Sequence, residues 1–406
     1  AAGTPLTLTF ADKPAAELAR ELIEKQFNVA LTRHGKTLEG AIAGDRGYVC
    51  PLCSSPFLSD ERQFNLMFKS SIGPVNPLEA VAAAIEAGKL EGLKGRELRG
   101  AIEELTQPSA VYLRPETAQA MFVQFLNVQQ SMSMKVPFGI AQMGKSFRNE
   151  ITVEHFIFRS CEFEQMEMEF FCEPGTDDEW ADYWRLERMK WWQKFANEKD
   201  RFRFRAHDPT ELAHYAKSCY DIEYAYPWGW GELEGIANRT DYDLKKHAQH
   251  SGAKLEYFDP VQNRKFVPYV IEPAAGATRG LLVYLIDAYH EEQVEGETRV
   301  VLRLHPRLAP IKVAVLPLVK KDGMPEKARK VAEAFLARGI NARYDEQHAI
   351  GRRYRRHDEI GTPFCLTIDS ETLSNDTITI RDRDTMAQRR ISIDGAVAEV
   401  ELLLNG

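Results

Sequence analysis

A set of arginine and glutamate residues in the middle of the chain, between residues 113 and 280, could bind charged ligands. An arginine fork binds phosphate through two parallel hydrogen bonds and stays charged when water is removed. A carboxylate holds Mg²⁺ or an ammonium group. One such residue alone would most often form a surface ion pair, whereas the whole set, beside glycine-rich turns, indicates a polar binding site. Its members are Arg114, Arg148, Arg159, Arg279, Glu116, Glu150, Glu167, Glu232, Glu234 and Glu272.

Two extended segments joined by a loop are predicted over residues 137–172, and the second would form the floor of this site. Its side chains alternate for several residues, which is the period of a strand whose two faces meet different surroundings. One face would carry a row of polar groups. The two expected faces are Phe163, Gln165 and Glu167 on one side, and Glu162, Glu164 and Met166 on the other.

The segments that would position these strands are predicted from the helical spacing of apolar residues. Thr117 or Glu116 would lie at the start of a helix, where backbone N–H groups need oxygen partners. Tryptophans that recur at helical spacing within 176–198 are interpreted as core or interface packing rather than as a platform for stacked bases. The predicted helices, or short strands followed by a helix, are 76–106, 111–127, 176–198 and 267–285.

The last hundred residues differ from the rest in charge and in element order. Residues 307–406 carry 17 Lys and Arg against 15 Asp and Glu, so they are slightly basic in a chain of formal net charge −8. This shift predicts two domains, 1–306 and 307–406. Strand–helix–strand order in the second predicts a small α/β domain with a mainly parallel sheet. The first 45 residues read as irregular pieces around one helix, residues 14–26.

Composition excludes several protein classes. With 44% hydrophobic and 28% charged residues over 406 positions, the chain is typical of a globular protein of two or three domains. No apolar run approaches the roughly 18 residues that cross a bilayer, and no signal peptide is visible. Six scattered cysteines do not form a disulfide framework. We therefore expect a cytoplasmic protein without a membrane-spanning segment.

Several strings of residues resemble the class II aminoacyl-tRNA synthetases. The set similar to motif 2 is Phe147, Arg148, Asn149, Glu150, Arg159, Phe163 and Glu167, and the set similar to motif 3 is Gly276, Arg279 and Gly280. Longer strings resemble the homodimeric type of glycyl-tRNA synthetase, from about residue 60 to the end. They are QFNLMFK (63–69), LRPETAQA (113–120), WRLERMKWW (184–192), ELEGIANRTDYDL (232–244), VIEPAAGATRG (270–280) and RRYRRHDEIGTPF (352–364).

This resemblance implies an α+β fold, in which an antiparallel sheet with flanking helices binds ATP and a C-terminal α/β domain binds the tRNA anticodon. It also implies ATP and Mg²⁺ as cofactors, and tRNA and glycine as further partners. A homodimer is implied as well, although the motif 1 that would build it is not identifiable before residue 60.

The roles of the family's nucleotide site carry over residue by residue. Arg148 would hold the α-phosphate, Glu150 the edge of adenine, and Phe163 would stack under the base. Arg159 and Arg279 would reach the γ-phosphate, and Arg279 would also cover the base. Each role suits its residue type, because guanidinium groups bind phosphate and an aromatic face stacks on a base.

The same resemblance implies a glycine site. Glu116 and Glu272 would surround the substrate ammonium, and Glu232 and Ala274 would complete the site. The implied reaction has two steps. The glycine carboxylate attacks the α-phosphorus of ATP and releases pyrophosphate, and a ribose hydroxyl of the tRNA terminus then attacks the glycyl-adenylate. The catalytic residues implied are Arg148, Arg279 and Glu116.

Three positions depart from the family pattern, and they keep alternatives open. Ala274 stands where the family usually has a serine that helps to bind glycine, Ala120 where it has glycine, and Cys161 where it commonly has arginine. We expect glycine binding weaker than is typical. Ala274 and Ala120 favour a class II synthetase for another small amino acid as the alternative. A non-catalytic binding subunit would be expected to lack the motif arginines, which are present.

Metal and tRNA sites complete the expectations. Glu234, with Glu167, would face Mg²⁺. Cys50 and Cys53 form half of a tetrahedral Zn²⁺ site, so either Zn²⁺ or a reduced thiol pair is possible there. A basic run in the C-terminal domain is either a solvated helix face or a contact with tRNA phosphates. It consists of Arg352, Arg353, Arg355 and Arg356.

Overall fold

The computed structural model describes residues 4–9, 13–27, 31–34, 37–42, 65–73 and 76–405. The chain divides into two compact units, residues 1–65 and 66–406. In the first, one helix accompanies an antiparallel sheet of order β1-β3-β2. The helix predicted over 14–26 is confirmed, but strands rather than irregular pieces flank it. The elements are β1 (Thr4–Thr9), α1 (Lys13–Phe27), β2 (Leu31–His34) and β3 (Thr37–Ile42).

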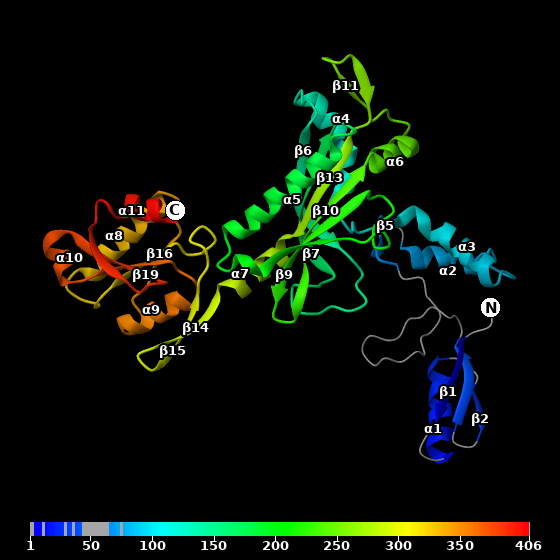
Figure 1. Cartoon of the computed structure of the whole chain (residues 1–406), viewed down its shortest axis with the longest axis horizontal. Coiled ribbons are helices and arrows are strands. Elements are labelled where there is room, and N and C mark those ends of the chain that lie inside the picture. The colour runs from blue at the N-terminus through cyan, green and yellow to red at the C-terminus, as the bar shows by residue number, and fades with distance from the viewer. Residues whose placement is uncertain are drawn as a thin grey trace. The chain divides into compact units, whose positions relative to one another are not determined.

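A six-stranded antiparallel sheet dominates the second unit (Figure 1). Its strand order is β6-β7-β13-β10-β9-β8, and every neighbouring pair is antiparallel. The two extended segments predicted within 137–172 are therefore confirmed as β6 and β7, and they pair with each other. The strands are β6 (Phe138–Phe147), β7 (Glu162–Cys172), β8 (Phe202–Ala206), β9 (Ser218–Tyr226), β10 (Gly229–Thr240) and β13 (Tyr269–Gly276).

Helix α5 (Asp177–Lys194) packs on one face of this sheet, against β10 and β13. Trp192 is fully buried in the core there, and Trp180 and Trp184 pack against the same core. The expectation of core packing is confirmed for these three. The approach is close, because a Cβ added to Gly280 of the neighbouring helix would lie 2.8 Å from the Trp192 ring. Only glycine fits there without movement.

Helix α7 (Ala277–Ala288) packs on the same core as α5, whereas α4 (Ala118–Ser131) and α6 (Tyr242–Ser251) pack on the opposite face of the sheet. Phe122 and Phe125 of α4 pack with Phe138 and Phe171 of β6 and β7, so α4 covers the end of the sheet where those strands lie. Helix α7 begins directly after β13, as the strand, turn and helix predicted over 267–285 require. None of the helices in the described ranges combines the length and apolarity that a bilayer-spanning segment needs.

Strand β10 contains a bulge that decides which side chains face the site. Glu232 pairs with Glu223 of β9, and Glu234 pairs with the next residue, Ile222. Leu233 is thus an extra residue, and two residues of β10 oppose one of β9 there. Alternation breaks at such a point. Glu232 and Glu234, which a regular strand would place on one face, therefore point to opposite sides.

Short helices and strands lie outside the large sheet and its packed helices. The helical pattern over 76–106 is confirmed as two helices rather than one. A short strand, β4, pairs with β5. The connecting elements are β4 (Lys69–Ser71), α2 (Pro77–Glu86), α3 (Gly95–Thr106), β5 (Ala110–Tyr112), β11 (Tyr257–Asp259), β12 (Arg264–Phe266), β14 (Tyr289–Val294), β15 (Glu297–Leu302) and two short 3₁₀ turns, Gln107–Ser109 and Lys199–Arg201.

The C-terminal residues form a five-stranded sheet of order β17-β16-β18-β19-β20 with its own apolar core. The prediction of a mainly parallel sheet is wrong for half of it. β17, β16 and β18 are parallel, but β19 and β20 add as an antiparallel hairpin. The elements are β16 (Val313–Pro317), α8 (Met324–Ala337), β17 (Ala342–Tyr344), α9 (Ile350–Glu359), β18 (Phe364–Ile368), α10 (Ser370–Asn375), β19 (Thr377–Asp382), β20 (Gln388–Ser392) and α11 (Ala396–Asn405).

The hairpin β14–β15 is bonded to this C-terminal sheet. Arg299 of β15 is fully buried, donates from Nε to Asp358 of α9 at 3.0 Å, and also donates to the backbone carbonyl of Arg383. The expected boundary between residues 306 and 307 lies after this hairpin and before β16, and it stays a prediction.

Candidate active site

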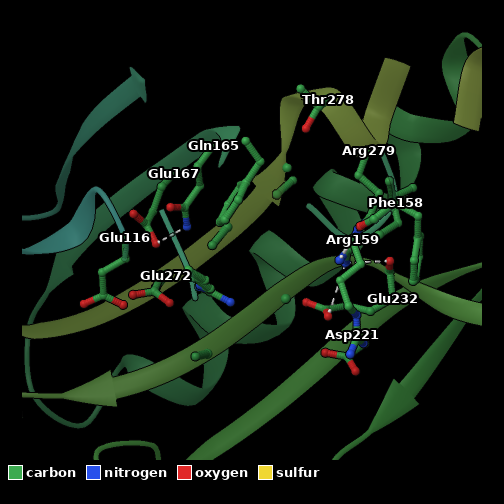
Figure 2. Close-up of a pocket in the computed structure, with 18 of the residues that line it drawn as sticks. Glu116, Phe158, Arg159, Gln165, Glu167, Asp221, Glu232, Glu272, Thr278 and Arg279 are labelled. Atoms are coloured by element: carbon green, nitrogen blue, oxygen red, sulfur yellow. Dashed lines mark hydrogen bonds and ion pairs between the residues drawn. The ribbon is translucent and has the colours of Figure 1, made fainter. Parts of the chain in front are cut away.

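A polar cavity of about 400 Å³ lies on the face of the six-stranded sheet opposite α5. Side chains of β7, β9, β10 and β13 form its floor, and the loop after β6 and the first turn of α7 form its wall. Figure 2 shows two groups of charged residues in it. Carboxylates with Gln165 gather at one end, and Arg159 and Arg279 lie with Phe158 at the other.

Arg279 is fixed at the second end by the loop before β7. Its Nε and Nη2 donate to the carbonyl oxygen of Phe158 at 3.2 and 3.1 Å, and its Nη1 donates to the carbonyl of Glu232 at 2.9 Å. The guanidinium lies 4.4 Å from the centre of the Phe158 ring. A flat cation is thus held on an aromatic face at the rim, in an orientation that can also cover a base.

The other residues predicted for ATP, apart from Glu234, also line this cavity. Arg148 follows β6, donates from Nε to the carbonyl of Pro115 at 3.1 Å, and lies 5.5 Å from the centre of the Phe163 ring. Glu150 and Arg159 also line the cavity. Arg159 is exposed, and only Glu154, 4.0 Å away, lies near its guanidinium among the described ion pairs. Its charge therefore faces solvent at the cavity mouth.

Three carboxylates form the acidic end. Glu116 precedes α4, Glu167 lies on β7 and Glu272 on β13, and all three line the cavity. Glu167 accepts hydrogen bonds from the backbone N–H and hydroxyl of Thr117, and from Gln165 at 2.9 Å. Thr117 is the residue before the first turn of α4, as predicted, but its hydroxyl bonds to Glu167 and does not cap the helix.

The acidic end holds more carboxyl groups than basic groups. Arg239 is the buried cation there, and it donates to Glu272 and, through both Nε and Nη2, to Asp243 at 2.7 and 2.9 Å. Burial raises the pKa of Glu272 to about 8, with Arg239 opposing the shift and Glu167 and Glu116 adding to it. Burial also raises the pKa of Glu167. An ammonium group bound here would supply the missing positive charge.

Ala274 lies between the two ends. Its register partners are Glu167 on β7 and Gly235 on β10, and it lines the cavity. Since both Ala274 and Gly235 are small, the floor is open at this point. A serine at position 274 would place a hydroxyl beside Glu167.

The structure contradicts the expectation that Glu234 binds Mg²⁺ or ATP. Glu234 is 1% exposed, accepts a hydrogen bond from Arg188 Nε at 2.7 Å, and is bonded to the Trp192 indole N–H. Both partners belong to α5, on the face of the sheet away from the cavity. The bulge at Leu233 is the physical reason. Glu232, on the other side of the bulge, does line the cavity, but beside Arg279 rather than beside Glu116.

The four arginines of the basic run of α9 differ in how far they are buried. Arg353 is 3% exposed and donates to the backbone carbonyls of Pro317, Leu318 and Asp345. It ties α9 to the end of β16, so its expected contact with tRNA is wrong. Arg352 is exposed, and Arg355 and Arg356 are half-buried. Cys50 and Cys53 lie outside the described residues.

Sequence reasoning missed two groups that shape the cavity. Arg239 and Asp243 lie in the string ELEGIANRTDYDL, but Arg239 ends up on β10 and Asp243 on α6, so no helical or strand spacing indicated their pairing. The other group is His207, Cys219 and Asp221, which also line the cavity; His207 Nε2 lies 2.8 Å from Asp221 Oδ2. The alternation of acidic and apolar residues in 218–226 would have placed Asp221 on the polar face.

Comparison with known proteins matches both parts of the second unit. Residues 104–288 match the family model of the class II tRNA synthetase core domain (G, H, P, S and T), and residues 312–402 match the anticodon binding domain. The first segment contains all six strands of the large sheet, and the second runs from the start of β16 into α11.

Curated glycine–tRNA ligases are similar over most of the chain. The protein from Caldanaerobacter subterraneus subsp. tengcongensis is 52% identical over 345 residues, which is 85% of this chain and 68% of that protein. Those of Acetivibrio thermocellus and Clostridium kluyveri are each 50% identical, over 88% and 86% of this chain and 71% and 69% of their own lengths. The chain belongs to the glycine–tRNA ligase family. The strands that form the floor of the cavity all lie within the matched core domain.

Proposed function

We propose that this protein attaches glycine to tRNA(Gly) through a glycyl-adenylate, using ATP. The observation that carries the proposal is one cavity with arginines and an aromatic face at one end and an unbalanced set of carboxylates at the other. A nucleoside triphosphate fits the first end, and a small zwitterion fits the second. The identity of about 50% to glycine–tRNA ligases supports glycine as the substrate.

The chemistry requires positioning and neutralisation of charge rather than a protein nucleophile. Arg148 binds the α-phosphate, where negative charge builds up as the glycine carboxylate attacks. Arg279, held over Phe158, covers the adenine and reaches toward the γ-phosphate, and Arg159 at the mouth meets the outer phosphates. Phe163 supplies the stacking face under the base, and Glu150 reads the base edge. Pyrophosphate leaves through the arginine end.

Glycine is selected at the acidic end. Glu116 and Glu272 receive the ammonium in charge-assisted hydrogen bonds, which are stronger than neutral ones. Glu167 and Thr117, bonded to each other, close one side of this end. Ala274 leaves space where the family usually has a serine, so glycine is bound with one hydrogen bond fewer.

Mg²⁺ accompanies ATP in this family. Some of the carboxylate oxygens in the cavity are suitable ligands for this ion. Carboxylate oxygens are its preferred protein ligands. Glu167 lines the cavity, and Glu232 projects beside Arg279 with half of its side chain exposed. Glu232, which lies with the arginines, would hold the ion, which neutralises phosphate charge when bound, whereas Glu167 lies at the other end of the cavity with Glu116 and Glu272 (Figure 2). Glu234 is excluded by its position on the α5 face.

The remaining partners follow from the C-terminal residues and from the family. We propose residues 307–406 as the anticodon-binding domain and 1–306 as the catalytic domain, with Arg352, Arg355 and Arg356 of α9 as phosphate contacts. We also propose the homodimeric type of assembly and a cytoplasmic location. A Zn²⁺ ion at Cys50 and Cys53 is proposed only as an alternative to a reduced thiol pair, and metal analysis of the purified protein decides between them.

Amino-acid-dependent exchange of pyrophosphate into ATP tests the function. Run across all twenty amino acids, it is expected to respond to glycine far more than to any other. A stronger response to alanine or serine would make the protein a synthetase for another small amino acid. Exchange with none of them would point to a binding subunit and overturn the proposal.

A further inference from the structure

The side chain of Gln119 connects the two carboxylates proposed for glycine. Gln119 lies in the first turn of α4, and its Nε2 donates to Glu116 Oε1 at 2.8 Å and to Asp243 Oδ1 at 3.3 Å. Asp243 in turn holds Arg239 through two hydrogen bonds, and Arg239 donates to Glu272. A continuous chain of hydrogen bonds thus runs from Glu116 to Glu272.

Of the three carboxylates at this end, Glu116 is the least buried. Glu272 is buried and bonded to Arg239, and Glu167 is held by Thr117 and Gln165. Glu116 is half-buried, and Gln119 is the side chain seen to donate to it among the described hydrogen bonds. Two carboxylates that face one ammonium repel each other before it binds. Gln119 is a neutral donor, so it holds Glu116 and Asp243 without neutralising the charge that the ammonium needs.

His247 of α6 fixes which way the Gln119 amide points. Carboxylates only accept hydrogen bonds, so the amide nitrogen must face Glu116 and Asp243, and the amide oxygen faces the other way. There it meets His247 Nε2 at 2.7 Å, in a shallow groove of α4 and α6. His247 must therefore carry a hydrogen on Nε2. Loss of this donor would let the amide rotate and turn its oxygen toward two carboxylates.

We propose that Gln119 is a positioning residue for amino-acid binding, and that His247 locks its orientation from the surface groove. The proposal rests on the proposed function, because it takes Glu116 and Glu272 as the ammonium ligands. It goes beyond that function by assigning a role to two residues that do not line the cavity. It predicts a loss confined to amino-acid binding, since neither residue lies near the arginine end.

The experiment measures KM for glycine and for ATP in pyrophosphate exchange. Gln119→Met removes the hydrogen bonds at similar volume and should raise KM for glycine about tenfold, as expected for losing a hydrogen bond to a charged group, with KM for ATP unchanged. Gln119→Glu should raise it further, because it adds a like charge beside Glu116 and Asp243. Gln124→Met is the matched control, since Gln124 is exposed on the same helix and bonds only locally to Asn127.

Variants of His247 provide a second, independent test of the proposal. His247→Ala should raise KM for glycine in the same direction as Gln119→Met, and His247→Gln, which restores an N–H donor, should recover most of the loss. His250→Ala, in the same groove, should change nothing. A structural role alone would lower the unfolding temperature without separating the two KM values and without rescue by glutamine.

Failure of this inference is distinguishable from failure of the proposed function. If wild-type exchange depends on glycine and Glu116→Gln impairs it, while Gln119→Met leaves KM for glycine unchanged, Gln119 has no positioning role and the function stands. If another amino acid drives exchange, glycine specificity falls, and KM for that amino acid gives the same test, because every amino acid carries the ammonium. Equal rises in KM for glycine and ATP would also overturn the inference.

Discussion

The carboxylate of Glu234 is bonded to Arg188, with Arg188 Nε 2.7 Å from Glu234 Oε1, on the face of the sheet opposite the cavity. This ion pair joins β10 to α5. It stabilises the sheet that positions the cavity, and neither side chain lines the cavity.

Glu234→Ala is therefore expected to lower stability. Removing Glu234 leaves Arg188, whose side chain is 20% exposed, without its ion-pair partner, and it leaves the buried Trp192 N–H unpaired. An unpaired buried polar group costs about 1–3 kcal/mol. The free energy of unfolding, measured by urea denaturation, should fall by that amount. Glu232→Gln, across the bulge, should leave stability almost unchanged and instead raise KM for ATP. A Glu234→Ala protein of normal stability that needs more Mg²⁺ would contradict this placement.

Arg279 is expected to be essential for adenylate formation. Its guanidinium is held by the Phe158 and Glu232 carbonyls at the end of the cavity that we propose for the nucleotide. Since removing one preorganised donor to developing charge costs about 10²–10³ in rate, Arg279→Ala should reduce glycine-dependent exchange by at least about 100-fold. Arg279→Lys should recover little, because lysine lacks the planar fork. A tenfold loss or less would refute this role.

Ala274→Ser is expected to improve glycine binding. The new hydroxyl would lie at the register position beside Glu167, and one hydrogen bond to a charged group contributes about 1.5–3 kcal/mol. KM for glycine should fall about tenfold or more. KM for ATP should not change. If instead glycine binding weakens, the open floor at Ala274 is a feature that this chain needs.

His357 of α9 is expected to make the C-terminal sheet sensitive to acid. The ring is fully buried, with Nδ1 3.1 Å from the Thr362 hydroxyl and Nε2 3.6 Å from Asp345. Burial lowers the pKa of His357 to about 4, with Asp345 opposing the shift and Arg343 and Arg356 adding to it.

The unfolded state therefore binds one proton more than the folded state between about pH 6.5 and pH 4. Stability is present above pH 6.5 and is lost as the pH falls through this window. Amide hydrogen exchange in β16 and β18, corrected for intrinsic rates, should show the loss, and His357→Gln should flatten it. A wild-type protein with constant protection from pH 7 to pH 4 would disagree.

The arginines of the basic run are expected to have two different roles, one in tRNA binding and one in stability. Arg352→Glu is expected to weaken tRNA binding and to reduce the dependence of log affinity on log salt by about one unit or more. Arg353→Leu should instead destabilise the C-terminal sheet, because three backbone carbonyls lose their donor. Filter binding over a salt series measures the first effect. An unchanged slope for Arg352→Glu would remove α9 from the tRNA interface.

Local periodicity was enough to predict part of the site. The alternation of Phe163, Gln165 and Glu167 placed all three on one face of β7, and all three line the cavity. The strand and turn leading to Arg279 and the helix after Thr117 were predicted for the same reason. Side-chain direction in a regular strand or helix depends only on spacing along the chain.

Tertiary structure decided what spacing does not encode. The bulge at Leu233 arises from pairing with β9, and it sends Glu234 to α5 and Glu232 to the cavity. Arg353 is buried because residues about thirty-five positions earlier pass beside α9, and Gln119 meets Asp243 across more than 120 residues. The sequence by itself determined the residue types and the regular elements that carry them. Pairing between distant strands and helices determined which charges face the substrate, because burial and register are properties of the contacts and not of the chain.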